Sequence, residues 1–156
     1  LPFLEAIRQL IIELGQQRCL SIHLTYVPYI AVSGEVKTKP TQHSVKELRS
    51  IGIQPDILMC RSTKALTVAE KNKISLFTNV IKENVFSLID VKNIYEVPSL
   101  LFNQKWLERI NLLWPDLNLS ADLTNWQNIF KANNQTKNQI NLGLVCKYSG
   151  LTDKLH

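Results

Sequence analysis

Short apolar, β-rich runs alternate with segments of helical periodicity along this chain, and no other feature of the sequence constrains its fold more. The runs 19–27, 57–60 and 85–88 have the composition of strands. Apolar residues at helical spacing predict helices over five segments, which are 3–14, 42–51, 67–78, 98–113 and 122–132. Strands that alternate with helices form parallel βαβ units. The sequence therefore predicts an α/β fold in which helices flank a parallel sheet, with the strand over 19–27 buried.

Length and composition predict one soluble globular domain. The chain has 156 residues, of which 45% are hydrophobic and 20% charged, which is ordinary for a domain with its own core. The apolar runs are too short to cross a membrane. The first residues have no basic segment and no methionine, so the start resembles a cut inside a longer chain. Cys19, Cys60 and Cys146 are odd in number and far apart, which predicts reduced thiols in a cytoplasmic protein.

The net charge of +5 permits a partner that carries phosphate. The lysines are scattered along the chain with acids between them, and no basic stripe interleaved with aromatic residues occurs. Nucleic acid is therefore a minor hypothesis. His23, His43 and His156 form no metal-ligand pattern, and His23 fits a hydrogen-bonded histidine of the core or of a sheet face better than a ligand.

The segment 34–43 places two lysines, a proline and a threonine immediately before a predicted helix. Pro40 restricts the backbone, so Lys37 and Lys39 can point the same way. Thr41 is a plausible N-cap. Positive charges beside a helix N-terminus favour an anion. A solvated surface loop is the alternative interpretation of this segment taken alone.

Charged side chains also follow the predicted strands. Arg61 and Ser62 end one strand, and Asp90 and Val91 follow the next. In open α/β sheets, ligands bind at the carboxyl ends of the strands. For Arg61 a plain surface ion pair is the alternative.

The last part of the chain differs in composition. Residues 133–138 are polar and unpatterned, which predicts a linker, and 140–146 predict the first strand of a further unit. Cys146 lies in that strand without the glycine-flanked elbow that a nucleophilic cysteine needs.

Three segments of the sequence resemble CTP synthase, and they are 1–9, 34–50 and 51–58. The run 34–48, GEVKTKPTQHSVKEL, is the most specific of them. The resemblance is dense over 1–98, thin over 99–137 and weak again over 139–153. It implies a P-loop-type amidoligase (synthetase) domain joined by a linker to a class I glutaminase domain. The chain would then hold the C-terminal half of the amidoligase domain, truncated at its N-terminus (1–118), a helix and linker (119–138) and an incomplete start of the glutaminase domain (139–156).

The resemblance also implies an activity and a set of site residues. CTP synthase aminates UTP to CTP with ATP as co-substrate, Mg²⁺ as cofactor and glutamine or ammonia as nitrogen source, and the family forms homotetramers. Glu5 and Arg8 would lie near the pyrimidine pocket. The UTP and CTP site would include Lys73, contributed by a neighbouring subunit, together with Lys37, Thr38, Lys39, Pro40, Thr41 and Gln42. The ATP adenine would contact Arg61, Ile89, Asp90 and Val91.

Several departures limit this transfer. Ile89 stands where the family commonly has lysine, Thr78 replaces a common cysteine, and Cys146 replaces a usual glycine. The sequence contains no Gly-rich phosphate loop, no acidic Mg²⁺ ligands of the family and no glutaminase Cys, His and Glu. We therefore expect the isolated chain to be inactive. The alternatives are a non-catalytic module for nucleotide binding or subunit association and, less favoured, a basic nucleic-acid-binding protein.

Overall fold

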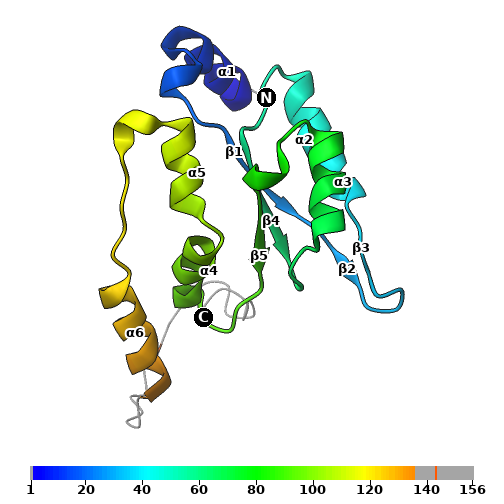
Figure 1. The fold of residues 1–156 in the computed structure, drawn as a ribbon. Helices are drawn as coiled ribbons and strands as arrows, with labels where there is room; N and C mark the ends of the chain where they lie inside the picture. Colours follow the sequence, from blue (N-terminus) through cyan, green and yellow to red (C-terminus); the bar gives the residue numbers. More distant parts are fainter. Residues whose placement is uncertain (1, 136–142, 144–156) are drawn as a thin grey trace.

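Three parallel strands form the sheet at the centre of the described part of this chain (Figure 1). The structure is a computed structural model that describes residues 2–135 and 143. The strands are β1 (Ile22–Tyr26), β4 (Ile57–Ser62) and β5 (Val85–Ile89), in the order β1-β4-β5. Leu58 of β4 pairs with His23 of β1 and with Val85 of β5. The predicted α/β fold with a parallel sheet is thus confirmed.

Helices cover the two faces of β4, so that this central strand is almost entirely buried. Alternate side chains of a strand point to opposite faces. Leu58 and Cys60 therefore join the core under α2 (Lys39–Ser50) and α3 (Val68–Thr78). Ile57 and Met59 join the core with Phe86 on the opposite face, under α4 (Val97–Asn103) and α5 (Trp106–Leu113). Figure 1 shows the two helix layers on either side of the sheet.

The strand predicted over 19–27 is shorter than expected and is not buried. Ile22, Leu24 and Tyr26 of β1 are 45%, 67% and 52% exposed. Within residues 2–135, β1 is an edge of the sheet, and no helix covers the face that carries these side chains. The apolar composition indicated the strand correctly, but composition alone does not say whether another element covers it.

The helix predicted over 3–14 is present as α1 (Pro2–Leu14), followed by the 3₁₀ turn η1 (Gln16–Arg18). No side chain of α1 is buried. Its apolar stripe is exposed at Phe3, Ile7 and Leu10. The helix therefore has the predicted amphipathic pattern, while the apolar side lacks a covering partner among the described residues.

The predicted loop 28–42 contains more structure than the sequence indicated. It holds an antiparallel hairpin of β2 (Tyr29–Ile30) and β3 (Glu35–Val36), which projects beside α2 and α3 (Figure 1). The helix predicted over 42–51 begins earlier, at Lys39. A proline in the first turn of a helix costs nothing because that turn has free N–H groups anyway, and Pro40 occupies this position.

The helix predicted over 98–113 is two helices. Lys105 adopts a left-handed backbone conformation, with φ +63°, between α4 and α5. The helix predicted over 67–78 is confirmed as α3, where Thr67 and Glu70 form a capping box. The short 3₁₀ turns η2 (Lys82–Asn84), η3 (Ile94–Glu96) and η4 (Pro115–Leu117) join these elements.

The last described helix is α6 (Thr124–Gln135), close to the predicted 122–132. Trp126 Nε1 donates a hydrogen bond to the Tyr95 carbonyl at 2.7 Å, which attaches α6 to η3. The predicted linker 133–138 is still helical at 133–135. The rest of that linker lies outside the described residues. So does the predicted strand 140–146, including Cys146, with the exception of Gly143. No helix that the structure describes is both long and apolar enough to cross a membrane.

Candidate functional site

Two lysines from separate parts of the chain lower the pKa of one carboxyl, that of Glu35, beside the start of α2. Lys37 Nζ lies 2.6 Å from Glu35 Oε2 in an exposed ion pair. The hydrogen bond and charge of Lys37 lower the pKa of the Glu35 carboxyl, and the charge of Lys73 on α3 lowers that pKa further. Within one chain the charge of Lys73 thus acts on the same carboxyl as Lys37, whereas the resemblance implies that Lys73 serves the site of a neighbouring subunit.

The first turn of α2 continues this basic surface. Thr38 is the N-cap residue but has helical backbone angles, and no side chain caps the turn. Lys39 and Pro40 are exposed there. Uncapped N–H groups and the helix dipole favour an anion at such a turn. The arrangement suits a phosphate group held by lysine charges and by the helix start.

The two threonines of this segment are not exposed. Thr38 is buried, and its hydroxyl accepts a hydrogen bond from Gln42 Nε2 at 3.0 Å. Thr41 is fully buried within the helix, so the predicted N-cap role is wrong. Its hydroxyl lies 3.0 Å from Thr25 Oγ1 and donates to the Tyr26 carbonyl at 3.3 Å. Both hydroxyls are thus engaged inside the protein, and sequence reasoning missed Thr25 because its partner is distant in the chain.

Arg61 and Asp90 meet at the carboxyl ends of β4 and β5. Arg61 Nε donates to Asp90 Oδ1 at 2.9 Å, and both side chains are exposed. The Asp90 N–H donates to the Ser62 carbonyl at 3.0 Å, so the sheet ladder itself positions this aspartate. Ile89 and Val91 beside it are half-buried. The structure brings together the residues proposed for ATP, at the sheet edge where α/β proteins bind ligands.

Glu5 and Arg8 form an ion pair with each other, with Arg8 Nη2 2.8 Å from Glu5 Oε2. Arg8 also packs on Gly52, which follows the C-terminal end of α2. A helix of this length spans roughly 18 Å, and Lys39 lies at its other end. Within one chain, the structure does not bring Glu5 and Arg8 to the lysines.

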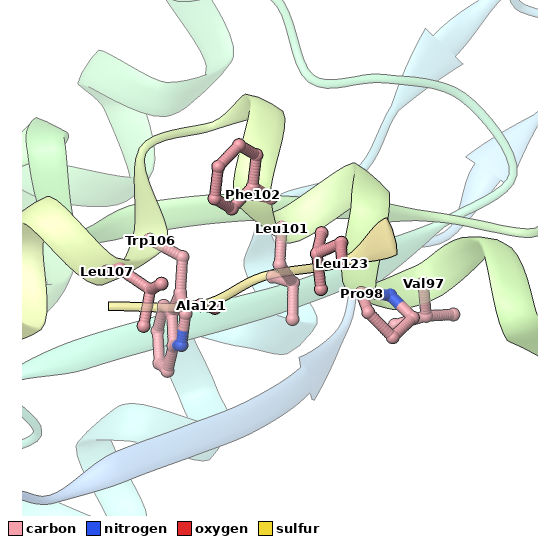
Figure 2. A pocket seen from close by; sticks show the side chains of 8 residues that line it. All are labelled: Val97, Pro98, Leu101, Phe102, Trp106, Leu107, Ala121 and Leu123. Carbon is pink, nitrogen blue, oxygen red and sulfur yellow. The ribbon is translucent and has the colours of Figure 1, made fainter. Parts of the chain in front are cut away.

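Two hollows of the described residues differ in chemistry. A hollow of about 630 Å³ is lined by Phe77 of α3 and, on α2, by Gln42, His43, Lys46, Arg49 and Ser50. The basic wall follows helical spacing, so the sequence carried a signal for it that our interpretation did not use. A smaller hollow of about 240 Å³ lies between α4, α5 and the segment before α6 (Figure 2). It is lined by apolar side chains, including Leu101, Phe102 and Trp106, and does not suit a phosphate.

The remaining candidate groups have structural roles. His23 is half-buried, and its Nε2 lies 2.8 Å from Ser44 Oγ, which confirms the prediction of a hydrogen-bonded histidine. Burial lowers its pKa. Burial also raises the pKa of the Cys60 thiol to about 12, which leaves it protonated and unreactive. Among residues 2–135 and 143, no group of three or more His, Cys, Asp or Glu side chains could hold a metal ion.

Comparisons with known proteins agree on one family. A family model described as "CTP synthase N-terminus" matches residues 1–114. A curated relative, "CTP synthase" of Oleidesulfovibrio alaskensis, is 52% identical over 152 residues, which cover 97% of this chain and 28% of the relative. The chain thus spans less than a third of that relative's length, and the matched model describes the N-terminal region of the family.

Proposed function

This chain belongs to the CTP synthase family, and we propose that it is the C-terminal half of the synthetase domain of a cytoplasmic CTP synthase. The family match ends at residue 114, and we place the boundary of this domain shortly after it, at 118. We assign 119–138 to a helix and linker and 139–156 to the start of a glutaminase domain. The complete enzyme would make CTP from UTP, with ATP as co-substrate and glutamine or ammonia as nitrogen source.

In this reaction ATP phosphorylates the 4-oxygen of uracil, and ammonia then displaces the phosphate. Phosphoryl transfer depends mainly on positioning and on charge stabilisation. We propose that Lys37 and Lys39, together with Lys73 contributed by a neighbouring subunit, hold the triphosphate of UTP, or of CTP as inhibitor, beside the first turn of α2. The exposed Pro40 and the half-buried Gln42 complete the surface of that turn.

One observation carries this proposal: Lys37 is paired with the Glu35 carboxylate immediately before the first turn of α2, beside the exposed Lys39. This lysine already holds an anionic group there, and a phosphate could take the same place. Thr38 and Thr41 contribute differently, because their buried hydroxyls bond inside the protein. We propose that these two threonines shape the segment and that the lysines contact the nucleotide.

The proposed ATP site lies at Arg61 and Asp90, with Ile89 and Val91 beside them. The Arg61–Asp90 ion pair supports it, because the pair presents a planar cation and a hydrogen-bond acceptor at the carboxyl edge of the sheet. An adenine ring can stack on a guanidinium plane and donate its amino group to a carboxylate. Ile89 would contribute only apolar contact where the family commonly has lysine.

We also propose that the pyrimidine pocket is completed between subunits of a homo-oligomer, which in the family is a tetramer. Glu5 and Arg8 lie at the far end of α2 from Lys39, too distant to contact the same nucleotide within one chain. If they contribute to the pocket, they do so for a neighbouring subunit. Mg²⁺ would accompany ATP, but the described residues offer no carboxylate group that fits it, so its ligands would lie elsewhere in the enzyme.

Calorimetric titration of UTP, CTP and ATP against the restored full-length enzyme, in its wild-type and Lys39→Ala forms, tests the proposal. A hydrogen bond to a charged group contributes about 1.5–3 kcal/mol, so UTP and CTP should bind about 10 to 150 times more weakly. ATP binding should change much less. Lys131→Ala, which removes an exposed charge from α6, is the matched control. Equal UTP affinity of wild type and Lys39→Ala would reject this assignment.

A second experiment separates a catalytic role from a module that only binds nucleotides or associates with other subunits. The isolated chain should form no CTP from UTP, ATP and ammonia. A chimera in which this chain replaces the matching segment of the Oleidesulfovibrio alaskensis relative should form CTP, and Lys39→Ala should weaken its use of UTP. A stable chimera that binds nucleotides but makes no CTP would favour the non-catalytic alternative.

A further inference from the structure

Hydrogen bonds between side chains, rather than apolar packing alone, attach the start of α2 to β1. Thr25 Oγ1 lies 3.0 Å from Thr41 Oγ1, and His23 Nε2 lies 2.8 Å from Ser44 Oγ. His23 and Thr25 are two residues apart on a strand and therefore share a face. Thr41 and Ser44 are three apart on a helix and are neighbours on its surface. The two bonds are thus consecutive links between the same strand face and the same helix side.

The direction of the Thr25–Thr41 bond follows from the third contact of Thr41. The Thr41 hydroxyl donates its proton to the Tyr26 carbonyl at 3.3 Å. A hydroxyl has one proton to donate, so Thr25 is the donor to Thr41. Both threonines are buried, at 7% and 0% exposure. A buried hydroxyl that loses its partner is costly, so this chain of bonds specifies one position of the helix.

The same stretch of backbone also holds the segment that carries Lys37. The Tyr26 carbonyl accepts from Thr41, and the Pro28 carbonyl accepts from the Lys37 N–H at 2.8 Å. The end of β1 therefore fixes both the lysine segment and the first turn of α2. Apolar contacts tolerate sliding, whereas hydrogen bonds weaken steeply with distance and angle.

We propose that Thr25 is a positioning residue for the nucleotide site, because its hydroxyl holds Thr41 and so sets where Lys39 and Gln42 stand. This role rests on the function proposed above. Thr25 itself is buried and does not contact the nucleotide. Its effect passes through α2, with the His23–Ser44 bond as a second link one turn further along.

Three variants of the restored full-length enzyme test this role. Thr25→Val removes the hydroxyl and nearly keeps the shape of the side chain, whereas Thr25→Ser retains the hydroxyl. Thr78→Val is the matched control, because Thr78 is fully buried and its hydroxyl donates to the Ile74 carbonyl at 2.7 Å, away from the start of α2. Losing one aligned contact should weaken UTP binding about 5- to 20-fold in Thr25→Val. Thr25→Ser and Thr78→Val should stay within about twofold of wild type.

Amide hydrogen exchange gives a readout that needs no nucleotide. Thr25→Val should speed exchange in the first two turns of α2 about tenfold relative to α3, and Thr78→Val should not. Equal UTP affinity of wild type and Thr25→Val would overturn the positioning role and leave the proposed function intact. The role is also overturned if affinity falls without faster exchange in α2, or if Thr78→Val weakens UTP equally. Failure of the restored full-length wild-type enzyme to bind UTP would instead reject the proposed function, and the positioning role with it.

Discussion

The side-chain amide of Gln104 bonds to both backbone groups of Ser87. The Ser87 N–H donates to Gln104 Oε1 at 2.9 Å, and Gln104 Nε2 donates to the Ser87 carbonyl at 2.8 Å. The amide thereby forms, on the unpaired side of β5, the hydrogen bonds that a neighbouring strand would otherwise form. Gln104 lies where α4 ends, directly before Lys105, whose left-handed backbone separates α4 from α5.

Gln104→Ala should therefore destabilise the protein more than an average surface substitution. Both hydrogen bonds to Ser87 and a third to the Leu100 carbonyl are lost, and two backbone groups of β5 are left without this partner, which predicts a loss of about 1–3 kcal/mol in the free energy of unfolding. Gln127→Ala, an exposed glutamine of α6, is the control and should change little. Urea denaturation of both variants measures the difference, and equal midpoints would contradict the prediction.

Gly52→Ala should be destabilising for two reasons. Gly52 has φ +92°, which side chains rarely adopt, and an added Cβ would lie 2.8 Å from Arg8 Cδ. Gly34 has φ +67°, and a Cβ added there would meet no atom within 4 Å, so Gly34→Ala has only the backbone cost of about 1–2 kcal/mol. We expect Gly52→Ala to lower the free energy of unfolding by more than Gly34→Ala. Adding Arg8→Ala should remove the difference, and thermal denaturation of the set measures it.

Stability should fall on acidification through a contribution from His23. Burial lowers the pKa of His23 in the folded protein below its ordinary value of 6.5. Between those two pKa values the unfolded chain binds the proton more readily, so the free energy of unfolding rises with pH across that window. The contribution is complete above pH 6.5 and is lost as the pH falls toward the folded pKa. Unfolding measured from about pH 7.5 to about pH 5 should be less pH-dependent in His23→Gln, and parallel curves would contradict this.

Glu35→Gln should strengthen binding of UTP if the Lys37 ammonium group serves a phosphate. The wild-type carboxylate competes for this charge, and the hydrogen bond and charge of Lys37 lower the pKa of Glu35. Exposed ion pairs are weak, so we expect an affinity gain of only about two- to fivefold. Glu47→Gln, an exposed acid further along α2, should give a smaller change. Calorimetry at low salt measures both, and weaker UTP binding by Glu35→Gln would show that Glu35 supports the lysines instead.

The isolated chain should self-associate. The face of β1 with Ile22, Leu24 and Tyr26 and the stripe of α1 are exposed within the described residues. Open strand edges and contiguous apolar surface promote association. Sedimentation should give a mass that increases with protein concentration. Leu24→Lys should reduce this increase while leaving the fold intact, whereas a monomer at all concentrations would contradict the prediction.

Local features of the sequence predicted most of the fold, because periodicity and composition act over a few residues. The strands around Leu58 and Phe86 and the helix α3 follow directly from such patterns. The burial of Thr41 and the pairing of Gln104 with β5 could not be predicted in this way. Each depends on a partner distant in the chain, Thr25 for one and Ser87 for the other.

In the candidate site, too, some features followed from local sequence and others depended on partners distant in the chain. Lys37, Arg61 and Asp90 were proposed from their positions beside predicted elements, and the structure places each near a charged partner. Which of the residues 37–42 are exposed was not predictable, because exposure is decided by how α2 docks on β1. The sequence therefore indicated the candidate segment 37–42. Within this segment, the packing of α2 on β1 buries the threonines and leaves the lysines exposed.

On β1, the hydrogen-bonding side chains of His23 and Thr25 face α2, whereas the large apolar side chains of Ile22, Leu24 and Tyr26 are exposed. A chain with this face uncovered displays the kind of surface that chaperones and quality-control proteases bind. Copies whose outer face is covered would escape surveillance, and uncovered copies would be retained or degraded.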